Sequence, residues 1–438
     1  MPRPPRGVSY RAAAAYISGL YEICGKYPNV LDVLSFGCRL NHAESQTIRR
    51  RASEAGLADA LVVNSCGVTA EAVRQVRQSI RAAKRANPTR TVILTGCAAE
   101  TDRGSFLAMP EVDRIVPNAR KLETTSYRQG SAPGAVEDGP AADWAAPTPD
   151  QGGWVRAFVE VQNGCDHTCT FCVIPVGRGR SRSRPASAVI DDVRRLAVAG
   201  YPEIVLTGVD LTAWGSDFGA ELRLGGLVRA VLTAVPEVVR LRLSSVDPVE
   251  VDSDLLAAFA DEERLMPHLH LSLQHGDDLI LRRMRRRHRR ADALALTDRL
   301  RRLRPDMVFG ADVIAGFPTE TEDMFRNTLT IVEDCDLSFL HVFPYSQRPG
   351  TTAARMPQVE RTVAKQRAAE LRECGERALI AQLDRECGQL RGVLVERANR
   401  GRSEQFFRVE LGAEAPVGSV VRARISGRQG MRLTAMAA

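Results

Sequence analysis

Short runs of apolar, often β-branched residues alternate with longer amphipathic stretches along most of this chain. That alternation predicts parallel strands joined by helices that cover a sheet. In the region 30–123 the expected helices are Glu44–Ala55 and Glu71–Ala86. The expected strands are Leu31–Phe36, Ala60–Asn64, Thr91–Thr95 and Asp113–Val116. The fold class is therefore α/β, and we expect this first region to form a flavodoxin-like parallel α/β domain.

A longer series of the same kind fills the region 154–375. Six strands at this rhythm predict an open, partial (β/α)6 barrel, with functional loops at the carboxyl ends of the strands. Its expected strands are Val155–Val161, Glu203–Thr207, Arg240–Ser244, His268–Leu273, Met307–Ile314 and Ser338–Phe343. Its expected helices are Ala188–Ala199, Leu224–Ala234, Ser253–Ala260, Ala291–Leu303 and Glu322–Glu333.

Composition marks where these regions end. Residues 124–153 are dominated by Gly, Pro, Ala and Asp, which predicts a linker. A charged helix, Val359–Cys387, leads into the last expected domain, 376–438. That tail predicts a small all-β barrel of the nucleic-acid-binding kind. Its short expected strands are Gly392–Arg397, Phe406–Leu411 and Ser419–Ile425.

Residues 1–29 precede the first expected strand and carry no acidic residue before Glu22. We interpret them as a flexible extension or a mis-assigned start, with a targeting signal as the alternative.

Composition narrows the class of protein. With 438 residues, of which 44% are apolar, the chain is long enough for two or three packed domains. A net charge of +7 favours a polyanionic partner only slightly. The ten cysteines are spaced unlike a secreted disulfide framework, so we expect a reducing, cytoplasmic location. No apolar run reaches the roughly 18 residues that would span a membrane.

Three cysteines in the stretch N-G-C-D-H-T-C-T-F-C are the strongest chemical signal. Cys165, Cys169 and Cys172 have the spacing C-x3-C-x2-C, and no fourth cysteine or histidine is expected to complete a tetrahedron. Structural zinc sites use four closed ligands. Three thiolates suit instead an iron–sulfur cubane with one open iron, which Phe171 would help to shield from water. A zinc knuckle with a distant fourth ligand is the alternative.

Three further cysteines each directly follow an expected strand of the first region. Cys38, Cys66 and Cys97 would therefore meet at one edge of the sheet, where α/β folds bind ligands. This placement favours a second cluster over the alternative, which is that they are small buried residues.

Clusters of arginine indicate contacts with phosphate. Residues 282–290 contain seven arginines and no acid, which favours phosphate binding over a solvated helix face. After the cysteine loop, guanidinium groups are suited to hold phosphates or a substrate carboxylate. In the tail, Arg402 beside Phe406 indicates phosphate contact with base stacking, although burial of Phe406 and Phe407 is an even alternative. The remaining candidates are Arg178, Arg180, Arg182, Arg184, Arg285, Arg286 and Arg287.

Many motifs, in order, resemble those of the radical S-adenosylmethionine (SAM) methylthiotransferases. They include S-F-G-C-R-L-N-H-A-E-S, V-V-N-S-C-G-V-T-A-E-A, L-T-G-C-A-A-E and C-D-H-T-C-T-F-C-V-I-P-V-G-R-G-R-S-R-S-R. Others are L-T-G-V-D-L, L-H-L-S-L-Q-H-G-D-D, D-V-I-A-G-F-P-T-E-T and L-H-V-F-P-Y-S-Q-R-P-G-T. The resemblance extends from about Val30 to the tail, and it implies a C-terminal TRAM domain for RNA.

The resemblance also implies the cofactors and the reaction. Cys165, Cys169 and Cys172 would hold a [4Fe–4S] cluster that cleaves SAM, and Cys38, Cys66 and Cys97 an auxiliary [4Fe–4S] cluster associated with the sulfur. The product would carry a methylthio group in place of a hydrogen on carbon. A low-potential electron donor of the flavodoxin or ferredoxin type would supply electrons to a monomeric enzyme. Residues expected to contact SAM are Phe171, Gly208, Gln274 and Gly316.

Three substrates are known within such a family: threonylcarbamoyladenosine in tRNA, isopentenyladenosine in tRNA, and an aspartate of a ribosomal protein. Arg39 in G-C-R-L-N and the serines within Arg180–Arg184 resemble the threonylcarbamoyladenosine group. We therefore expect methylthiolation at C2 of N6-threonylcarbamoyladenosine, next to the anticodon. A non-catalytic, zinc-stabilised RNA-binding protein is the alternative from a different class.

Overall fold

A computed structural model describes residues 31–128, 144, 145, 147, 155–219 and 222–437. The chain divides into two compact units, Met1–Asp143 and Trp144–Ala438. The predicted extension 1–29 and most of the predicted linker 124–153 lie outside the described residues. In the described part, no helix is long and apolar enough to cross a membrane.

The first unit is a parallel sheet with strand order β1-β2-β3-β4, as the alternating pattern predicts. The strands follow chain order. This differs from a flavodoxin sheet, whose order 2-1-3-4-5 places the first strand between the second and the third. Val63, Leu94 and Val76 belong to its apolar core. The strands are β1 (Asp32–Ser35), β2 (Ala60–Ser65), β3 (Thr91–Gly96) and β4 (Arg114–Ile115). The helices are α2 (Arg39–Glu54), α3 (Ala70–Ala86), α4 (Cys97–Thr101) and α5 (Arg103–Leu107), with short 3-10 turns at Asn118–Arg120 and Thr124–Tyr127.

Helix α2 begins five residues before the expected start, because its first turn is tied to the sheet. The Asn41 side chain donates to the carbonyl oxygens of Phe36 (2.7 Å) and Ser65 (3.0 Å). These bonds link distant segments, so no local pattern of apolar residues could indicate them.

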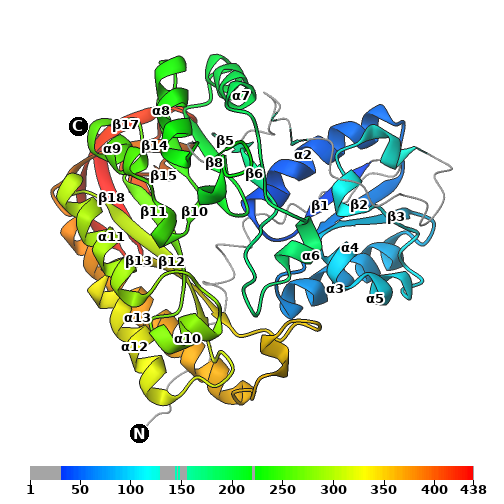
Figure 1. Cartoon of the computed structure of the whole chain (residues 1–438). Helices are drawn as coiled ribbons and strands as arrows, with labels where there is room; N and C mark the ends of the chain where they lie inside the picture. The colour runs from blue at the N-terminus through cyan, green and yellow to red at the C-terminus, as the bar shows by residue number, and fades with distance from the viewer. Residues whose placement is uncertain (1–30, 129–143, 146, 148–154, 220–221, 438) are drawn as a thin grey trace, which may run out of the picture. The chain divides into compact units, whose positions relative to one another are not determined.

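The second unit contains the six-stranded open barrel that the pattern predicts (Figure 1). Two parallel sheets, β5-β8-β9 and β10-β11-β12-β13, follow chain order, and a single bridge from Leu241 to Leu265 extends the pairing beyond β9. The expected strand Arg240–Ser244 corresponds to β9, which ends at Leu243, and β10 follows it as a separate short strand. The strands are β5 (Arg156–Glu160), β8 (Glu203–Thr207), β9 (Arg240–Leu243), β10 (Ser245–Val246), β11 (His268–Gln274), β12 (Val308–Ala315) and β13 (Leu337–Pro344).

Helices connect successive barrel strands. Two of the expected ranges, Glu203–Thr207 and Leu224–Ala234, match the observed elements to the residue. A small hairpin beside the barrel pairs β6 (Gln162–Asn163) with β7 (Arg182–Ser183). The helices are α6 (Ile174–Arg178), α7 (Ala186–Val198), α8 (Leu224–Ala234), α9 (Ser253–Asp261), α10 (Asp278–Arg283), α11 (Arg290–Leu303) and α12 (Glu322–Asp334). Short 3-10 turns lie at Leu211–Ala213, Pro248–Glu250 and Ala353–Arg355.

Helix α13 (Arg361–Arg385) leads into a closed five-stranded barrel with strand order β14-β15-β16-β18-β17, consistent with a TRAM domain. The sequence pattern missed β15, which is short and basic, and β18. At Gly401 of β15 a Cβ would lie 2.1 Å from the Leu394 carbonyl oxygen, so close strand contact requires glycine there. The strands are β14 (Leu390–Arg397), β15 (Arg400–Arg402), β16 (Arg408–Leu411), β17 (Val420–Gln429) and β18 (Arg432–Ala437).

The tail packs on the amino-terminal end of the larger barrel. Buried Glu203 accepts from Arg242 (2.8 Å) and Arg156 (2.7 Å) at this end. Phe406 is only 6% exposed and lies under the guanidinium groups of Arg242 and Arg402. Stacking of RNA bases on Phe406 is therefore wrong as an expectation, because this ring is already covered by the protein. Phe407 is buried as well.

Candidate active site

The first cysteine triplet lies at the carboxyl edge of the sheet in the first unit. Strand pairing places Ser65 of β2 opposite Gly96 of β3. Cys66 and Cys97 are the residues that follow, so they leave adjacent strands at the same level. Because paired strands lie about 4.8 Å apart, strand register alone holds these two cysteine backbones close together.

Gly37 brings the third cysteine loop to the same edge. Its φ is +100°, and a Cβ atom there would lie 2.9 Å from the Sγ atom of Cys66. Gly37 therefore packs directly against Cys66, and its neighbour Cys38 begins α2 beside them. Cys38 is exposed, Cys66 half-buried and Cys97 buried. The structure thus brings the three loops together at one solvent-accessible edge.

The second triplet occupies one loop of the second unit. The loop starts at Gly164, with a φ of +74°, where a Cβ atom would lie 1.9 Å from the Arg180 carbonyl oxygen. Only glycine permits so close a crossing of two segments. Thr170 then donates to the carbonyl oxygens of Arg283 (2.8 Å) and Met284 (3.1 Å), which holds the middle of the loop. The three thiols, of Cys165, Cys169 and Cys172, are all half-buried.

The spacing of the thiol groups tests which metal they fit. Zinc holds sulfur at about 2.3 Å, so its thiolates lie about 3.8 Å apart. Among the described residues, two groups of three potential ligand atoms lie mutually within 4.8 Å, and neither unites the three cysteines of a triplet. The compact group that includes Cys165 is completed by His167 and Asp210 and not by the other two cysteines. A donor set of three thiolates fits three separate iron corners of a cubane.

His167 corrects the expectation that no histidine stands near the second triplet. Its Nε2 atom lies 2.6 Å from Asp210 Oδ2, which is itself 3.5 Å from Cys165 Sγ. Burial and then the Asp210 carboxylate raise the pKa of the Cys165 thiol. His167 lies between Cys165 and Cys169, but its partner Asp210 is distant in sequence, so the spacing of the motif does not indicate this contact.

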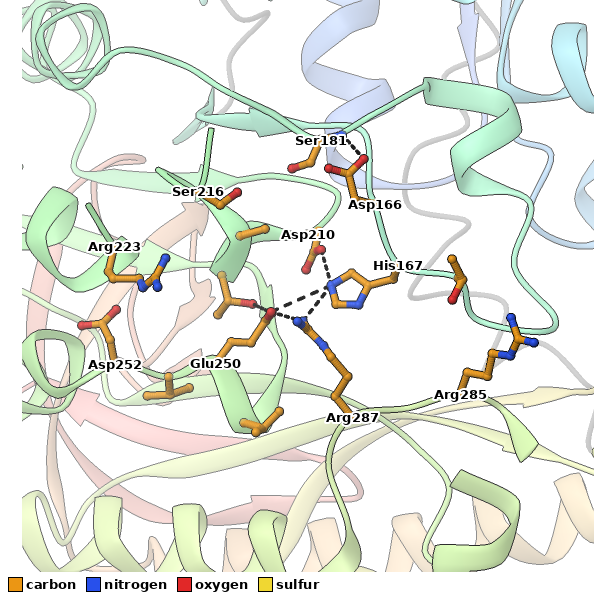
Figure 2. Close-up of a pocket in the computed structure, with 15 residues that line it drawn as sticks. Asp166, His167, Ser181, Asp210, Ser216, Arg223, Glu250, Asp252, Arg285 and Arg287 are labelled. Atoms are coloured by element: carbon orange, nitrogen blue, oxygen red, sulfur yellow. Dashed lines mark hydrogen bonds and ion pairs between the residues drawn. The ribbon is translucent and has the colours of Figure 1, made fainter. Parts of the chain in front are cut away.

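A cavity of ≈ 650 Å³ opens beside this loop. Figure 2 shows His167 pointing towards Asp210, Glu250 and Arg287 across it. Glu250 accepts from Arg287 and, at 2.7 Å, from Thr212. Most of the lining residues are polar and carry both signs of charge, and Val249 and Val251 add apolar surface. The charged members are Asp166, His167, Asp210, Arg223, Glu250, Asp252, Arg285 and Arg287.

Of the four residues expected to contact SAM, Phe171 lies within the second cysteine loop and the other three lie at strand ends. Gly208 follows β8, Gln274 ends β11 with a φ of +68°, and Gly316 follows β12 with a φ of +72°. A Cβ at Gly316 would lie 2.3 Å from Ala364 of α13, so this glycine already admits a close protein contact. Phe171 packs edge-on against Phe317, with ring centroids 6.3 Å apart.

Three arginines of the run 282–290 form ion pairs with acidic residues, contrary to the expectation from the sequence. Arg286 bonds Asp247 (2.7 Å), and Arg287 and Arg290 bond Glu250 and Asp334. Its acidic partners come from other parts of the chain, which a local charge count misses. Arg285 is exposed.

The arginines after the cysteine loop differ from one another. Arg180 is 92% exposed, whereas Arg184 is buried and paired with Asp192 (2.6 Å). Arg178 donates to Asn163 (3.1 Å), and Arg182 lies over the ring of Trp144. Burial makes Arg184 and Arg286 poor candidates for RNA phosphate contacts.

Comparisons with known proteins agree with this architecture. A family described as the radical SAM superfamily matches residues 159–332, and uncharacterized protein family UPF0004 matches residues 31–117. The radical SAM methyltransferase TsrM from Kitasatospora setae has a similar fold. It aligns with a TM-score of 0.51 at 16% identity, over 74% of this chain and 76% of that one. The open barrel with its three-cysteine loop defines a radical SAM enzyme, a class that uses SAM and a [4Fe–4S] cluster.

Named relatives narrow the class. "Threonylcarbamoyladenosine tRNA methylthiotransferase MtaB" of Rickettsia prowazekii is 43% identical, over 90% of this chain and 94% of its own length. The Thermotoga maritima protein of that name is 34% identical, over 83% and 85%. "tRNA-2-methylthio-N(6)-dimethylallyladenosine synthase" of Erythrobacter litoralis is 33% identical, over 91% and 95%. The chain belongs to the radical SAM methylthiotransferase family.

Proposed function

We propose that this enzyme methylthiolates C2 of N6-threonylcarbamoyladenosine next to the anticodon of tRNA, forming 2-methylthio-N6-threonylcarbamoyladenosine. The carrying observation is the 43% identity to a protein of that name over 94% of its length. It is supported by the two cysteine triplets, one in each unit, because adding a methylthio group requires both a radical source and a sulfur source.

The proposal gives each triplet one task. Cys165, Cys169 and Cys172 hold the cluster at which SAM binds, and Cys38, Cys66 and Cys97 hold the auxiliary cluster. When bound, these groups supply the reductive cleavage of SAM and the sulfur of the methylthio group. Gly208, Gln274, Gly316 and Phe171 border the SAM site. A flavodoxin or ferredoxin type donor provides the electrons.

The arginine and serine side chains of the cavity support the choice of substrate. A threonylcarbamoyl group carries a carboxylate, a hydroxyl and amide groups, and an arginine binds a carboxylate with two parallel hydrogen bonds. Arg223, Arg285 and Arg287 line the cavity together with Ser181 and Ser216. An isopentenyl group offers no polar atom, so it would form no hydrogen bond with these side chains.

Contacts with tRNA are assigned to the accessible arginines of the second unit. Arg180 and Arg285 are exposed, and Arg178, Arg182 and Arg287 lie near them along the same two segments. The domain limits that we propose are 30–123 for the auxiliary cluster, 154–375 for the radical SAM barrel and 376–438 for the TRAM-like barrel.

The test is expression in a bacterium that lacks its own tRNA methylthiotransferases, followed by mass spectrometry of nucleosides from digested tRNA. A methylthio mass added to threonylcarbamoyladenosine is the expected result. The same mass on isopentenyladenosine would move the enzyme to the second candidate, which the 33% identity to a dimethylallyladenosine synthase favours. If both nucleosides stay unmodified while the protein carries its iron, the proposal fails and ribosomal protein is examined next.

A further inference from the structure

Arg286 lies against the second cysteine loop, although it belongs to a run that its composition assigns to the surface. Its Nη1 atom lies 3.7 Å from the Sγ atom of Cys169, within the range of a hydrogen bond to sulfur. The side chain is only 9% exposed. A buried guanidinium therefore faces one of the three thiols proposed to bind iron.

Two strong bonds fix the orientation of this guanidinium. Nη2 donates to Asp247 Oδ2 and to the carbonyl oxygen of Ser272, both at 2.7 Å. The cysteine loop is itself bonded to the backbone just before Arg286, through Thr170 and the carbonyl oxygen of Met284 (3.1 Å). The Arg286 side chain is therefore held by Asp247 and Ser272, and the cysteine loop is held by Met284, so the contact with Cys169 does not depend on a mobile side chain.

The bonds to Asp247 and Ser272 leave part of the guanidinium without a partner. The buried Nε atom of Arg286 has none within the described protein. A buried donor without an acceptor costs free energy, which points to an acceptor supplied by a bound group. If Arg286 served only to anchor Asp247, neither this orphaned donor nor the contact with sulfur would be explained.

We propose that Arg286 is a positioning residue that donates hydrogen bonds to the Cys169 thiolate and to the cluster it binds, and thereby raises the reduction potential of the SAM-cleaving cluster. This inference rests on the proposed assignment of that cluster to Cys165, Cys169 and Cys172. Reduction adds one negative charge to the cluster, and hydrogen bonds to its sulfur atoms stabilise the more negative form. Burial limits screening of this interaction by water and salt.

Asp247 weakens this effect without cancelling it. Its carboxylate faces Nη2, whereas Nη1 faces the sulfur, so the positive end of the ion pair points towards the cluster. The carboxylate also accepts from the backbone of Val249 (3.3 Å), and His288 Nδ1 lies 3.7 Å away. These contacts provide the Asp247 carboxylate with further donors on the side away from Arg286, which partly neutralise its negative charge.

The experiment is a reductive titration of the full chain, followed by electron paramagnetic resonance and by iron analysis. The triple variant Cys38→Ala, Cys66→Ala and Cys97→Ala serves as the parent, so that only the SAM-cleaving cluster contributes. Arg286→Gln should lower the equilibrium constant for one-electron reduction at least about tenfold, a shift of about 59 mV to more negative potential. Arg286→Lys should restore part of the shift, because it keeps the charge but lacks the fixed fork of donors.

Arg282→Gln is the matched control, since it removes the same charge from an exposed position of the same run. Its potential should equal that of the parent. An unchanged potential in iron-loaded Arg286→Gln overturns the proposal. If that variant binds no iron, Arg286→Lys decides, and a potential equal to the parent's overturns the proposal. No tRNA is present, so an error in the assigned nucleoside leaves this result intact. A parent without a redox-active cluster would instead refute the cluster assignment itself.

Discussion

The cysteine triplet of the first unit is spread over the ends of three strands, whereas the triplet of the second unit lies within the single stretch Cys165–Cys172. The first set meets only because β2 and β3 pair in the correct register and Gly37 packs on Cys66. The second set is close in sequence, but its loop is held by Gly164 and by bonds from Thr170 to a distant segment. The pairing of the sheet strands therefore positions the first triplet. Contacts with segments outside the loop position the second triplet.

Cysteine substitutions separate the two triplets most strongly. Cys165→Ala should reduce the formation of 5′-deoxyadenosine to background, because it removes a ligand from the proposed SAM-cleaving cluster. Cys66→Ala should stop the methylthiolated product while some 5′-deoxyadenosine still forms. Chromatography of SAM products and nucleoside mass spectrometry on one reaction measure both. Cys387→Ala, at an exposed cysteine outside both triplets, is the control. Undiminished methylthiolation in either variant would contradict the division of tasks.

Glycine substitutions test how each triplet is held without touching a cysteine. At Gly96 (φ +88°) a Cβ would lie 2.4 Å from the Ser65 carbonyl oxygen, and at Gly164 it would lie 1.9 Å from that of Arg180. Alanine at either position should lower iron from about eight to about four per chain. Gly96→Ala should keep the formation of 5′-deoxyadenosine, whereas Gly164→Ala should lose it.

Two other glycines provide controls for backbone strain alone. Gly56 (φ +72°) and Gly179 (φ +77°) also have positive φ, but a Cβ atom there meets nothing within 4 Å. Alanine at these positions should cost about 1 kcal/mol of stability with full iron content. Equal iron loss in Gly179→Ala and Gly164→Ala would mean that crowding against Arg180 does not hold the loop.

The same contrast between local and distant order explains what the sequence could predict. Strand β8 and helix α8 agree with expectation to the residue, because the apolar periodicity of each is strong and the signals for its ends are local in sequence. The start of α2 was missed, since bonds from Asn41 to Phe36 and Ser65 bridge separate segments.

The candidate site follows the same rule. Cysteine spacing and strand order predicted where both triplets lie, because both depend on the chain order of elements. The inward turn of Arg286 was not predictable, as its partner Asp247 is 39 residues away. Burial of Phe406 likewise depends on Arg242, which belongs to the other barrel.

Glu203 lies at the amino-terminal end of the barrel, opposite the cysteine loop. Residues at this end are expected to contribute to stability and not to catalysis. Burial raises the pKa of the Glu203 carboxyl, and Arg242, Arg156 and Arg240 lower it, with a net lowering. Because the folded pKa lies below the unfolded one, this stabilisation is present above about pH 4 and is lost as the pH falls further.

Glu203→Gln should therefore cost about 3 kcal/mol near neutral pH, since it leaves buried arginines without their counter-charge. Thermal unfolding at a series of pH values measures this, with exposed Glu370→Gln as the control. The difference between variant and parent should shrink below about pH 4. A pH-independent difference would mean that packing, and not charge, stabilises this end.

The smallest effect is expected where the second cysteine loop meets RNA. Arg180→Gln and Arg285→Gln each remove one exposed charge from the segments that flank the cavity. Each should weaken tRNA binding and reduce the salt slope of the affinity by about 1, because one phosphate contact releases about one counterion. Fluorescence anisotropy across a salt series measures the slope. Arg326→Gln, exposed on α12, should leave it unchanged. An unaltered slope in both variants would place the RNA interface elsewhere. The residues that line the cavity would then be the remaining candidates near this loop for contact with the substrate.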